Sequence, residues 1–351
     1  MSAEPGMPGD AAATWRMPAE WEPHERTWMA FPTGGYTLGE SSTEADEARD
    51  CWASVANAIV RFEPVTVVVD PSDVDVARAR LDPAVDILVA DLDDAWMRDI
   101  GPTFVVGPAG ERAGVDWVFN GWGAQHWATW ENDAAIGVRV CGAAGVPVVG
   151  SPLVNEGGGI HVNGAGTVLL TRTVQLDEGR NPGWTAAQVE DELHRTLGVR
   201  RAIWLDRGLT RDYDEFGTRG HVDIVACFAG EQTVLVHDQR DPAHPDHAVS
   251  TEVRALLEAE GDLTVIAVPA PDTLRDHDGW VDYSYINHYV VNGGVILCAF
   301  DDPGDERAAA ILRAAYPGRE VVLVDARPLF ARGGGIHCIT QQQPDPGGRQ
   351  A

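Results

Sequence analysis

Lysine is absent from this sequence of 351 residues, so all 26 Lys+Arg side chains are arginine. Without lysine, the protein can form neither a Schiff base nor the lysine contact of a phosphate-binding loop. Long apolar runs are also missing, because no window approaches the roughly 18 residues of a membrane-spanning helix. Residues 1–14 have neither the basic nor the apolar segment of a signal peptide. These absences exclude pyridoxal enzymes, lysine-dependent phosphate-loop enzymes and membrane-spanning proteins.

Positive charge is scarce, with 26 arginines against 54 Asp+Glu and a formal net charge of −28. This balance argues against nucleic acid and against anionic membranes as partners, and it suits a small cationic molecule. Most of the acidic residues also fit a solvated surface that binds nothing.

Cysteines are few and odd in number, and their spacing suggests no pairing. They are Cys51, Cys141, Cys227, Cys298 and Cys338. Such usage indicates free thiols and a cytoplasmic protein.

Hydrophobic residues make up 44% of the chain, enough for a large core. The length exceeds the roughly 250–300 residues of a single ordinary core, so we expect two domains or one closed architecture built from repeats. Helical patterns alternate with apolar strand patterns. Helices are predicted at about 45–62, 73–81, 133–144, 185–197, 247–259 and 304–315, and strands at 65–69, 85–90, 146–149, 202–205, 263–268 and 321–324.

Internal repetition is the most informative feature. Gly157-Gly158-Gly159-Ile160-His161 recurs as Gly333-Gly334-Gly335-Ile336-His337, and Gly220-His221-Val222-Asp223 and Ile286-Asn287-His288-Tyr289 echo it. With Asp99, these polar positions follow one another at intervals of about 50–60 residues, which is typical of repeats packed around an axis. The sequence therefore predicts about five α/β units, each with polar residues at one equivalent point.

Cys338 is predicted in a short strand, where side chains alternate, so that His337 faces the opposite side and cannot be its base. It stands where valine follows His161 and His221 in the sister units. This unusual residue type at a repeated position favours a nucleophile. A buried small hydrophobe is the alternative.

His221 and Asp223 are predicted to share one face of a strand. Asp99 lies in an acidic loop, and Glu156 directly precedes a triple glycine. Each alone also fits an ordinary surface or turn residue. Together with Cys338 they suit a guanidinium, which carboxylates bind through paired hydrogen bonds. Zinc is the competing use of these residue types, but no C-x-x-C, H-x-x-x-H or H-E-x-x-H spacing occurs, so we favour covalent catalysis without a metal.

Five motifs carry a resemblance to a known family. They are Met17-Pro18-Ala19-Glu20-Trp21-Glu22-Pro23-His24, Trp96-Met97-Arg98-Asp99-Ile100-Gly101-Pro102-Thr103, Glu156-Gly157-Gly158-Gly159-Ile160-His161, Gly220-His221-Val222-Asp223 and Gly334-Gly335-Ile336-His337-Cys338-Ile339-Thr340-Gln341-Gln342. From about residue 17 to 344 the chain resembles the agmatine deiminase family, of the guanidino-group-modifying superfamily with the five-bladed α/β-propeller (pentein) fold. The resemblance implies one domain over 15–344, with tails at 1–14 and 345–351.

The resemblance also implies cofactor-free hydrolysis of a guanidine to a ureido product and ammonia. For agmatine, the product would be N-carbamoylputrescine, a step of polyamine biosynthesis. Another guanidine, such as an arginine derivative or a natural-product intermediate, is the alternative substrate, and a non-catalytic binding propeller is an alternative of another class. The partner expected is a small cationic guanidine, and self-association into a homo-oligomer is left open.

By motif, Cys338 corresponds to the nucleophile and His221 to the general acid and base. Asp99 and Asp223 correspond to the carboxylates that bind the guanidinium, and Glu156 to the carboxylate that binds a substrate nitrogen and supports His221.

Trp96 either stacks on the substrate or anchors its own loop in the core. Three stretches depart from the family pattern, at 33–40, at 121–127 and at Gly335, where the family has Asn. The guanidine chemistry therefore has more support than the identity of the substrate tail.

Overall fold

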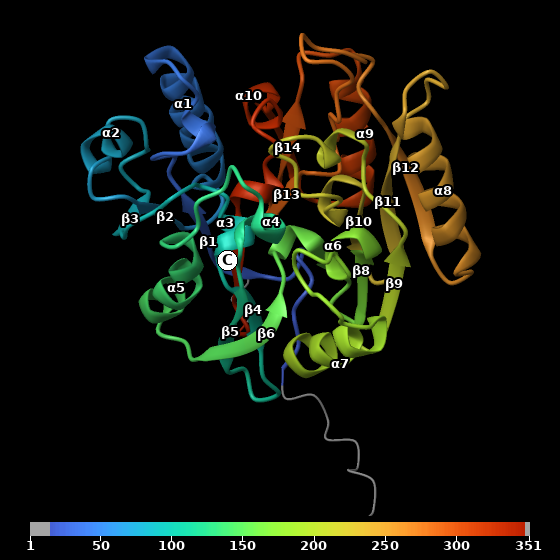
Figure 1. Ribbon diagram of the computed structural model, residues 1–351, viewed down its shortest axis with the longest axis horizontal. Helices are drawn as coiled ribbons and strands as arrows, with labels where there is room; N and C mark the ends of the chain where they lie inside the picture. The colour runs from blue at the N-terminus through green and yellow to red at the C-terminus, as the bar shows by residue number, and fades with distance from the viewer. Residues whose placement is uncertain (1–14, 348–351) are drawn as a thin grey trace, which may run out of the picture.

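The structure, a computed structural model, describes residues 15–347. The N-terminal tail predicted at 1–14 and residues 348–351 of the C-terminal tail lie outside the described residues. Five small mixed sheets follow one another around the molecule (Figure 1). The architecture is the predicted five-bladed α/β propeller.

Each of the four blades from β4 onward consists of an antiparallel hairpin followed by an outer strand that is parallel to the hairpin's second strand. The blades are β4(Thr103–Val106)-β5(Arg112–Val118)-β6(Val148–Val154), β7(Ile160–Val162)-β8(Thr167–Thr171)-β9(Arg201–Leu205), β10(Ala226–Gly230)-β11(Thr233–Asp238)-β12(Thr264–Pro269) and β13(Tyr289–Val291)-β14(Gly294–Ala299)-β15(Glu320–Asp325).

The remaining blade joins the two ends of the described chain, in the order β16(Gln341–Pro344)-β1(His24–Ala30)-β2(Val65–Val69)-β3(Asp86–Val89). The antiparallel pair brings Trp28 opposite Gln341, and the Trp28 indole donates to Gln343 at 2.8 Å. β16 thus supplies the strand that the other blades obtain from their own hairpins.

Helices lie in the connections between parallel strands, except α3 and α10, which lie between one blade and the next. They are α1(Ser42–Ile59), α2(Val74–Arg78), α3(Met97–Ile100), α4(Gly121–Ala124), α5(Ile136–Ala144), α6(Arg172–Gln175), α7(Ala186–Leu197), α8(Asp246–Ala259), α9(Gly304–Ala315) and α10(Arg327–Phe330). Local sequence sets their limits: Ser41 and Glu44 form a capping box at the start of α1, and Gly198 ends α7 in the left-handed conformation. All six predicted helices and six predicted strands are present; β2 and α9 have the predicted bounds, and the others have shifted ends.

The turns that enter the first strand of each blade meet near the centre. Three of them are short 3-10 helices, η3(Gly157–Gly159) before β7, η5(Val222–Ile224) before β10 and η6(His337–Ile339) before β16. α3 has the same place before β4. Residues 286–288 precede β13.

Two local predictions are wrong. His221 and Asp223 lie at and within the turn η5, and His337 and Cys338 lie in η6, so neither pair is on a strand. A 3-10 turn has about three residues per revolution, which removes the alternation used to separate the side chains.

The letter-for-letter repeat is also out of phase. His161 is the second residue of β7, whereas His337 lies before β16 begins at Gln341. Position by position, Cys338 therefore corresponds to Asp223 of η5 and not to a valine.

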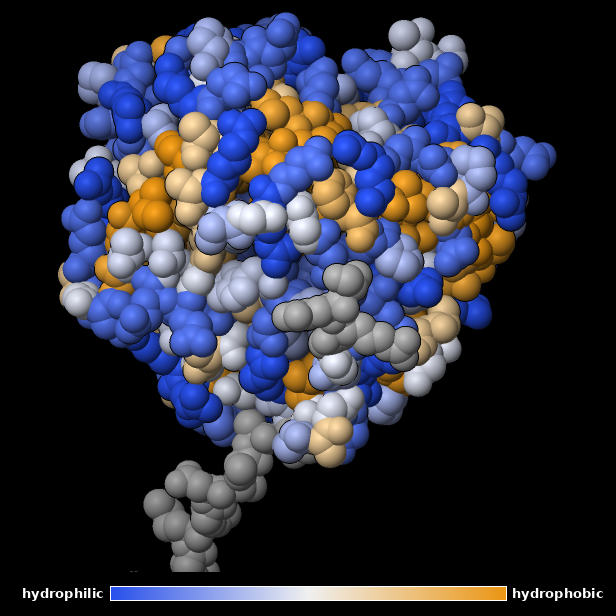
Figure 2. Space-filling view, turned by 180° about the vertical axis from the view of Figure 1, so that it is seen from behind, coloured by the Kyte–Doolittle hydropathy of each residue, from blue (hydrophilic) through white to orange (hydrophobic). Residues whose placement is uncertain are grey.

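The buried hydrophobic residues of the described chain form three clusters, and Trp28, Trp52 and Met97 of the first are among the largest fully buried side chains. Hydrophilic residues cover most of the face seen in Figure 2, and hydrophobic residues form separate patches on it. Among the described residues, we find no helix whose length and apolarity would let it cross a membrane.

Candidate active site

Five predicted site residues are brought together by the central turns. Asp99 comes from α3, Glu156 from the residue before η3, His221 and Asp223 from η5, and Cys338 from η6. Each is at most 5% exposed. Five ionisable groups in one desolvated space are unfavourable for folding unless they pair, which is typical of a functional site.

Cys338 lies between an amide and a carboxylate. Its Sγ is 3.3 Å from Asn287 Nδ2 and 3.5 Å from Asp223 Oδ2. Burial raises the pKa of the Cys338 thiol well above its usual value, and Asp223 and Asp99 raise it further. The thiol is therefore protonated in the free protein, and a cation placed beside it would favour the thiolate.

His221 is held at one ring nitrogen and free at the other. Its Nε2 is 3.2 Å from Glu156 Oε2, and its Nδ1 has no hydrogen-bond partner among the described residues, with Asp99 Oδ2 at 3.9 Å. Burial alone would lower the pKa of His221, but Asp99 and Glu156 raise it to about 9. The imidazole is therefore charged at neutral pH, with an unused proton at Nδ1.

Glu156 is in turn fixed by a buried arginine. Arg180 Nε lies 3.0 Å from both Glu156 oxygens, and its Nη1 donates to Asp177 at 2.9 Å. Burial would raise the pKa of Glu156, but the Arg180 guanidinium and His221 lower it to about 2. This carboxylate stays ionised and keeps His221 in one orientation.

The two aspartates differ in their surroundings. Asp99 accepts hydrogen bonds from the Trp122 indole at 2.9 Å and from the Gly158 amide at 3.1 Å, and burial raises its pKa to about 6. Asp223 Oδ2 binds His337 Nδ1 at 2.8 Å, whereas Asp223 Oδ1 is buried and finds no hydrogen-bond partner within residues 15–347. An unpaired buried carboxylate oxygen beside a thiol is suited to a cationic ligand.

Glycine is required where the turns touch. A Cβ at position 158 would lie 2.5 Å from His221 Nδ1 and 3.1 Å from Asp223 Oδ2, so only glycine leaves room for both. A Cβ at Gly335 would collide with the Asn287 carboxamide. Gly335, where the family pattern has Asn, therefore leaves room for the Asn287 side chain that contacts Cys338.

Trp96 precedes α3 and is buried in the core, with its ring edge-on to Trp52 at 5.3 Å. Its other edge lies against the loop of Cys338, because a Cβ at Gly334 would come 2.5 Å from the Trp96 ring. The geometry thus fits a loop anchor that also borders the site.

The two longer departures from the family pattern meet in space. Tyr36 and Trp127 pack edge-on at 4.8 Å, Tyr36 stacks on Phe216 at 4.4 Å, and Trp127 stacks on Trp122 at 5.3 Å. Because Trp122 also binds Asp99, this aromatic cluster (Tyr36, Trp122, Trp127 and Phe216) adjoins the predicted carboxylates.

Sequence reasoning missed several groups that hold the site. Arg180 lies in a loop with no motif to mark it. Asn287 falls within the repeat at 286–289, which could have pointed to it. Glu20 and His337 were part of the quoted motifs but were given no role.

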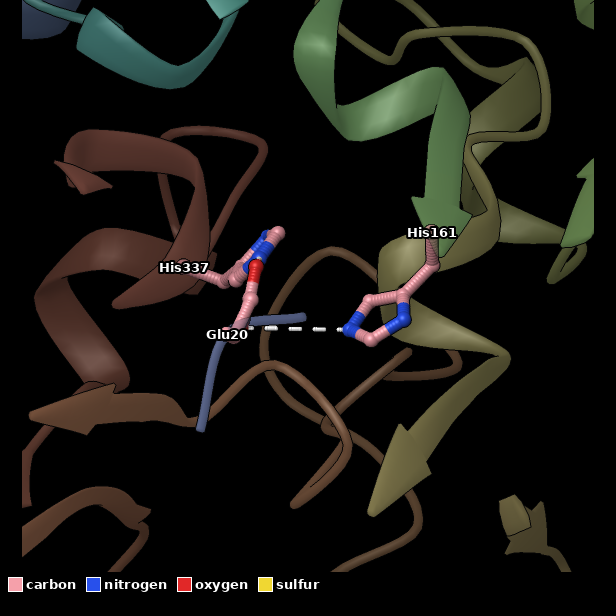
Figure 3. A group of neighbouring side chains, drawn as sticks. All are labelled: Glu20, His161 and His337. Atoms are coloured by element: carbon pink, nitrogen blue, oxygen red, sulfur yellow. Dashed lines mark hydrogen bonds and ion pairs between the residues drawn. The ribbon is translucent and has the colours of Figure 1, made fainter. Parts of the chain in front are cut away.

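Glu20 lies between the rings of His337 and His161 (Figure 3). Its Oε1 is 2.6 Å from His337 Nε2, and its Oε2 is 3.8 Å from His161 Nε2. Among the described residues, Glu20, His161 and His337 form one of two groups spaced so that they could hold a metal ion. Arg98 Nη1 stands 3.5 Å from Glu20, and this positive charge disfavours a metal cation there.

A buried cysteine, an imidazole and three carboxylates at the centre of a five-bladed α/β propeller define a pentein. The sequence profile of the Porphyromonas-type peptidyl-arginine deiminase family matches residues 16–344. The chain belongs to this family, which confirms the resemblance seen in the motifs.

Individual relatives cover nearly the whole chain. A Streptomyces coelicolor protein, provisionally named agmatine deiminase, is 60% identical over 340 residues, 94% of this chain and 99% of that protein. The agmatine deiminase of Pseudomonas fluorescens is 39% identical over 362 residues, 95% of this chain and 96% of that protein. The structure of the agmatine deiminase of Enterococcus faecalis matches with a TM-score of 0.88 and 31% identity, over 95% of this chain and 96% of that chain.

Proposed function

We propose that this protein is an agmatine deiminase, which hydrolyses agmatine to N-carbamoylputrescine and ammonia through a covalent intermediate on Cys338. The observation that carries the proposal is the gathering of Cys338, His221, Glu156, Asp223 and Asp99 at the centre of the propeller. The names of the Pseudomonas and Enterococcus relatives support agmatine as the substrate.

The binding step follows from the unpaired atoms. The guanidinium offers five N–H donors in a plane, and Asp223 Oδ1 is a buried acceptor without a partner. Asp99 faces the same space, next to His221. As the cation enters, the Cys338 thiol releases its proton to solvent, so that one positive charge replaces another in the site.

In the first half of the reaction, the Cys338 thiolate attacks the guanidinium carbon and a carbon–sulfur bond forms. The His221 imidazolium then transfers its Nδ1 proton to a substrate nitrogen, which leaves as ammonia when the carbon–nitrogen bond breaks. Asp99 and Asp223 hold the remaining amidino group, whose charge they stabilise. The product of this half is a Cys338–amidino adduct with neutral His221.

In the second half, neutral His221 takes a proton from water while the oxygen attacks the amidino carbon. The carbon–sulfur bond then breaks with its electron pair on Cys338, and the remaining hydroxyl proton is lost to solvent as the carbonyl of the ureido product forms. The product leaves, His221 is again an imidazolium, and Cys338 regains its proton from solvent. Because Glu156 binds only Nε2, the same Nδ1 atom donates in the first half and accepts in the second.

A second candidate function is the same chemistry on another guanidine. In the aromatic cluster, Tyr36, Trp122 and Trp127 come from two segments that depart from the family pattern, which favours keeping this candidate. Ammonia release with agmatine, arginine, guanidinobutyrate and methylated arginines separates the two. Highest kcat/KM on agmatine is expected, and release from none of these substrates would favour a non-catalytic binding propeller.

Further properties belong to the same proposal. We infer one catalytic domain over 15–344, a cytoplasmic location consistent with five unpaired buried cysteines, and catalysis without a cofactor. Trp96 is proposed to border the substrate stem. Self-association stays a prediction, which light scattering of the purified protein would test.

A further inference from the structure

His337 directly precedes the proposed nucleophile, but among the described residues the sulfur of Cys338 contacts Asn287 and Asp223 and not His337. Its two ring nitrogens are instead taken by two carboxylates from distant segments, Asp223 Oδ2 at 2.8 Å and Glu20 Oε1 at 2.6 Å. The imidazole is 2% exposed, so both contacts are desolvated. A chain of contacts therefore runs from Glu20 through His337 and Asp223 to Cys338 Sγ.

The hydrogen-bond chemistry of this chain restricts the protonation of His337. An ionised carboxylate only accepts hydrogen bonds, whereas a neutral imidazole has one donor and one acceptor nitrogen. With a carboxylate oxygen within 2.8 Å of each nitrogen, both nitrogens must donate, and the ring must carry a positive charge.

We propose that His337 is a positioning residue: a permanently charged imidazolium, clamped by Glu20, that binds Asp223 Oδ2 and thereby presents Asp223 Oδ1 to the substrate guanidinium. The inference rests on the proposed function, because it gives Asp223 the role of a guanidinium ligand. It adds to that function a reason why one Asp223 oxygen is occupied and the other is free.

The surroundings of His337 support the charged form. The groups that face it are Glu20, Asp223, Arg98, His161, His288 and Cys338. Burial and the Arg98 charge would lower the pKa of His337, but Glu20 and Asp223 outweigh them and raise it. The same pairing lowers the pKa of Glu20 well below its usual value.

The charge also matters for the thiol. Asp223 lies 3.5 Å from Cys338 and by itself opposes thiolate formation. An imidazolium on the other side of Asp223 offsets part of that negative charge. Loss of the His337 charge would therefore weaken both substrate binding and thiol ionisation.

The test compares three variants. His337→Asn keeps a short donor toward Asp223 but removes the charge and the Glu20 contact, and Glu20→Gln keeps an acceptor but removes the clamping charge. His161→Asn is the matched control, because His161 belongs to the same buried cluster and lies 3.8 Å from Glu20, but its Nδ1 accepts from the Phe228 amide instead of contacting Asp223.

For kinetics, we expect kcat/KM on agmatine to fall roughly 100-fold in His337→Asn and roughly 10-fold in Glu20→Gln, with KM raised in both. In Glu20→Gln the alkaline limb of the kcat/KM profile should move to lower pH, because His337 loses its proton more easily. His161→Asn should stay within about threefold of wild type. A merely structural defect would lower kcat and leave KM and the profile unchanged, and this result would overturn the proposal.

A measurement without turnover keeps the inference separate from the proposed function. Nitrogen-15 NMR of histidine-labelled protein at about pH 8, above the usual histidine pKa of about 6.5, should show a ring with both nitrogens protonated that is missing in His337→Asn. A neutral His337 ring would overturn the proposal, as would stoichiometric metal that is lost in His161→Asn. If the wild type released no ammonia from agmatine, the proposed function would fail, and the NMR comparison alone would decide the state of His337.

Discussion

Two buried histidines at the centre of the propeller, His221 and His337, have similar partners at one ring nitrogen and different surroundings at the other. His221 Nε2 binds Glu156, which binds Arg180, and His337 Nε2 binds Glu20, which lies beside Arg98. The difference is at Nδ1, which has no partner in His221 and is bound to Asp223 in His337. The same kind of carboxylate contact at Nε2 can therefore belong to a histidine that transfers a proton or to one that keeps a fixed charge, depending on the partner of Nδ1.

The largest effect should come from replacing Cys338, the proposed nucleophile. Cys338→Ser should lower turnover by more than about 10⁴-fold, because a serine hydroxyl is not ionised by a neighbouring cation. Intact-mass analysis during turnover of the wild type should show an amidino adduct on Cys338. An active serine variant, or an adduct on another cysteine, would contradict the assignment.

The next largest effect should distinguish specific binding of the guanidinium by Asp99 and Asp223 from attraction by the overall negative charge of the protein. Asp99→Asn and Asp223→Asn each remove a buried partner of the guanidinium, which typically costs roughly 3–5 kcal/mol. This corresponds to about two to four factors of ten in kcat/KM.

Glu258→Gln is the control for these two variants, because Glu258 is an exposed acid on α8 that pairs only with Arg254. It should change kcat/KM little. Losses in the two Asn variants no larger than in this control would rule out the guanidinium clamp.

Glu156→Gln should weaken the hold on His221, the proposed proton donor. Loss of a charge-assisted hydrogen bond costs roughly 1.5–3 kcal/mol, about one to two factors of ten in kcat/KM. Since Glu156 raises the pKa of His221, its removal should move the alkaline limb of the kcat/KM profile to lower pH. An unchanged limb would mean that His221 is not the group titrating there.

The wild-type profile should itself be bell-shaped. As pH rises through about 9, His221 loses the proton that the leaving ammonia needs, and activity falls. As pH falls through about 6, Asp99 becomes neutral and binds the guanidinium less well. Initial rates at low agmatine concentration across this range would measure both limbs.

The smallest effect expected is that of metal removal. Activity should survive exhaustive treatment with EDTA or phenanthroline, because Cys338 and His221 carry the proposed chemistry. Stoichiometric zinc in active protein, with loss of activity on chelation, would contradict covalent catalysis and would point to a metal such as one held by Glu20, His161 and His337.

The sequence predicted the blades better than the turns. Amphipathic periodicity marks α7 and α9, and apolar runs mark β2 and β12, because these patterns arise from the core itself. The segments of η5 and η6 were predicted as strands, because glycine followed by alternating polar and apolar residues occurs in strands as well as in such 3-10 turns. His221, Asp223 and Cys338 were nonetheless singled out, because polar residues recur at the entrances of the blades.

The sequence could not predict the contacts that hold the site residues in place. Arg180 reaches Glu156 across 24 residues, and Glu20 reaches His337 across 317 residues. No periodicity reports such pairs, since they depend on how the blades close. Asn287 had a weak signal in its repeat, but its contact with Cys338 depends on the absence of a side chain at Gly335.

The closure of the propeller has a consequence for biosynthesis. Cys338 directly precedes the strand β16, which pairs with β1. A chain emerging from the ribosome thus presents Asp99, Glu156 and His221 well before the nucleophile. Until β16 arrives, β1 is an open edge whose unpaired N–H and C=O groups can recruit other nascent chains. β16, the last of the described strands, therefore covers the open edge of β1 and directly follows the proposed nucleophile, so a chain that stops before Cys338 lacks both.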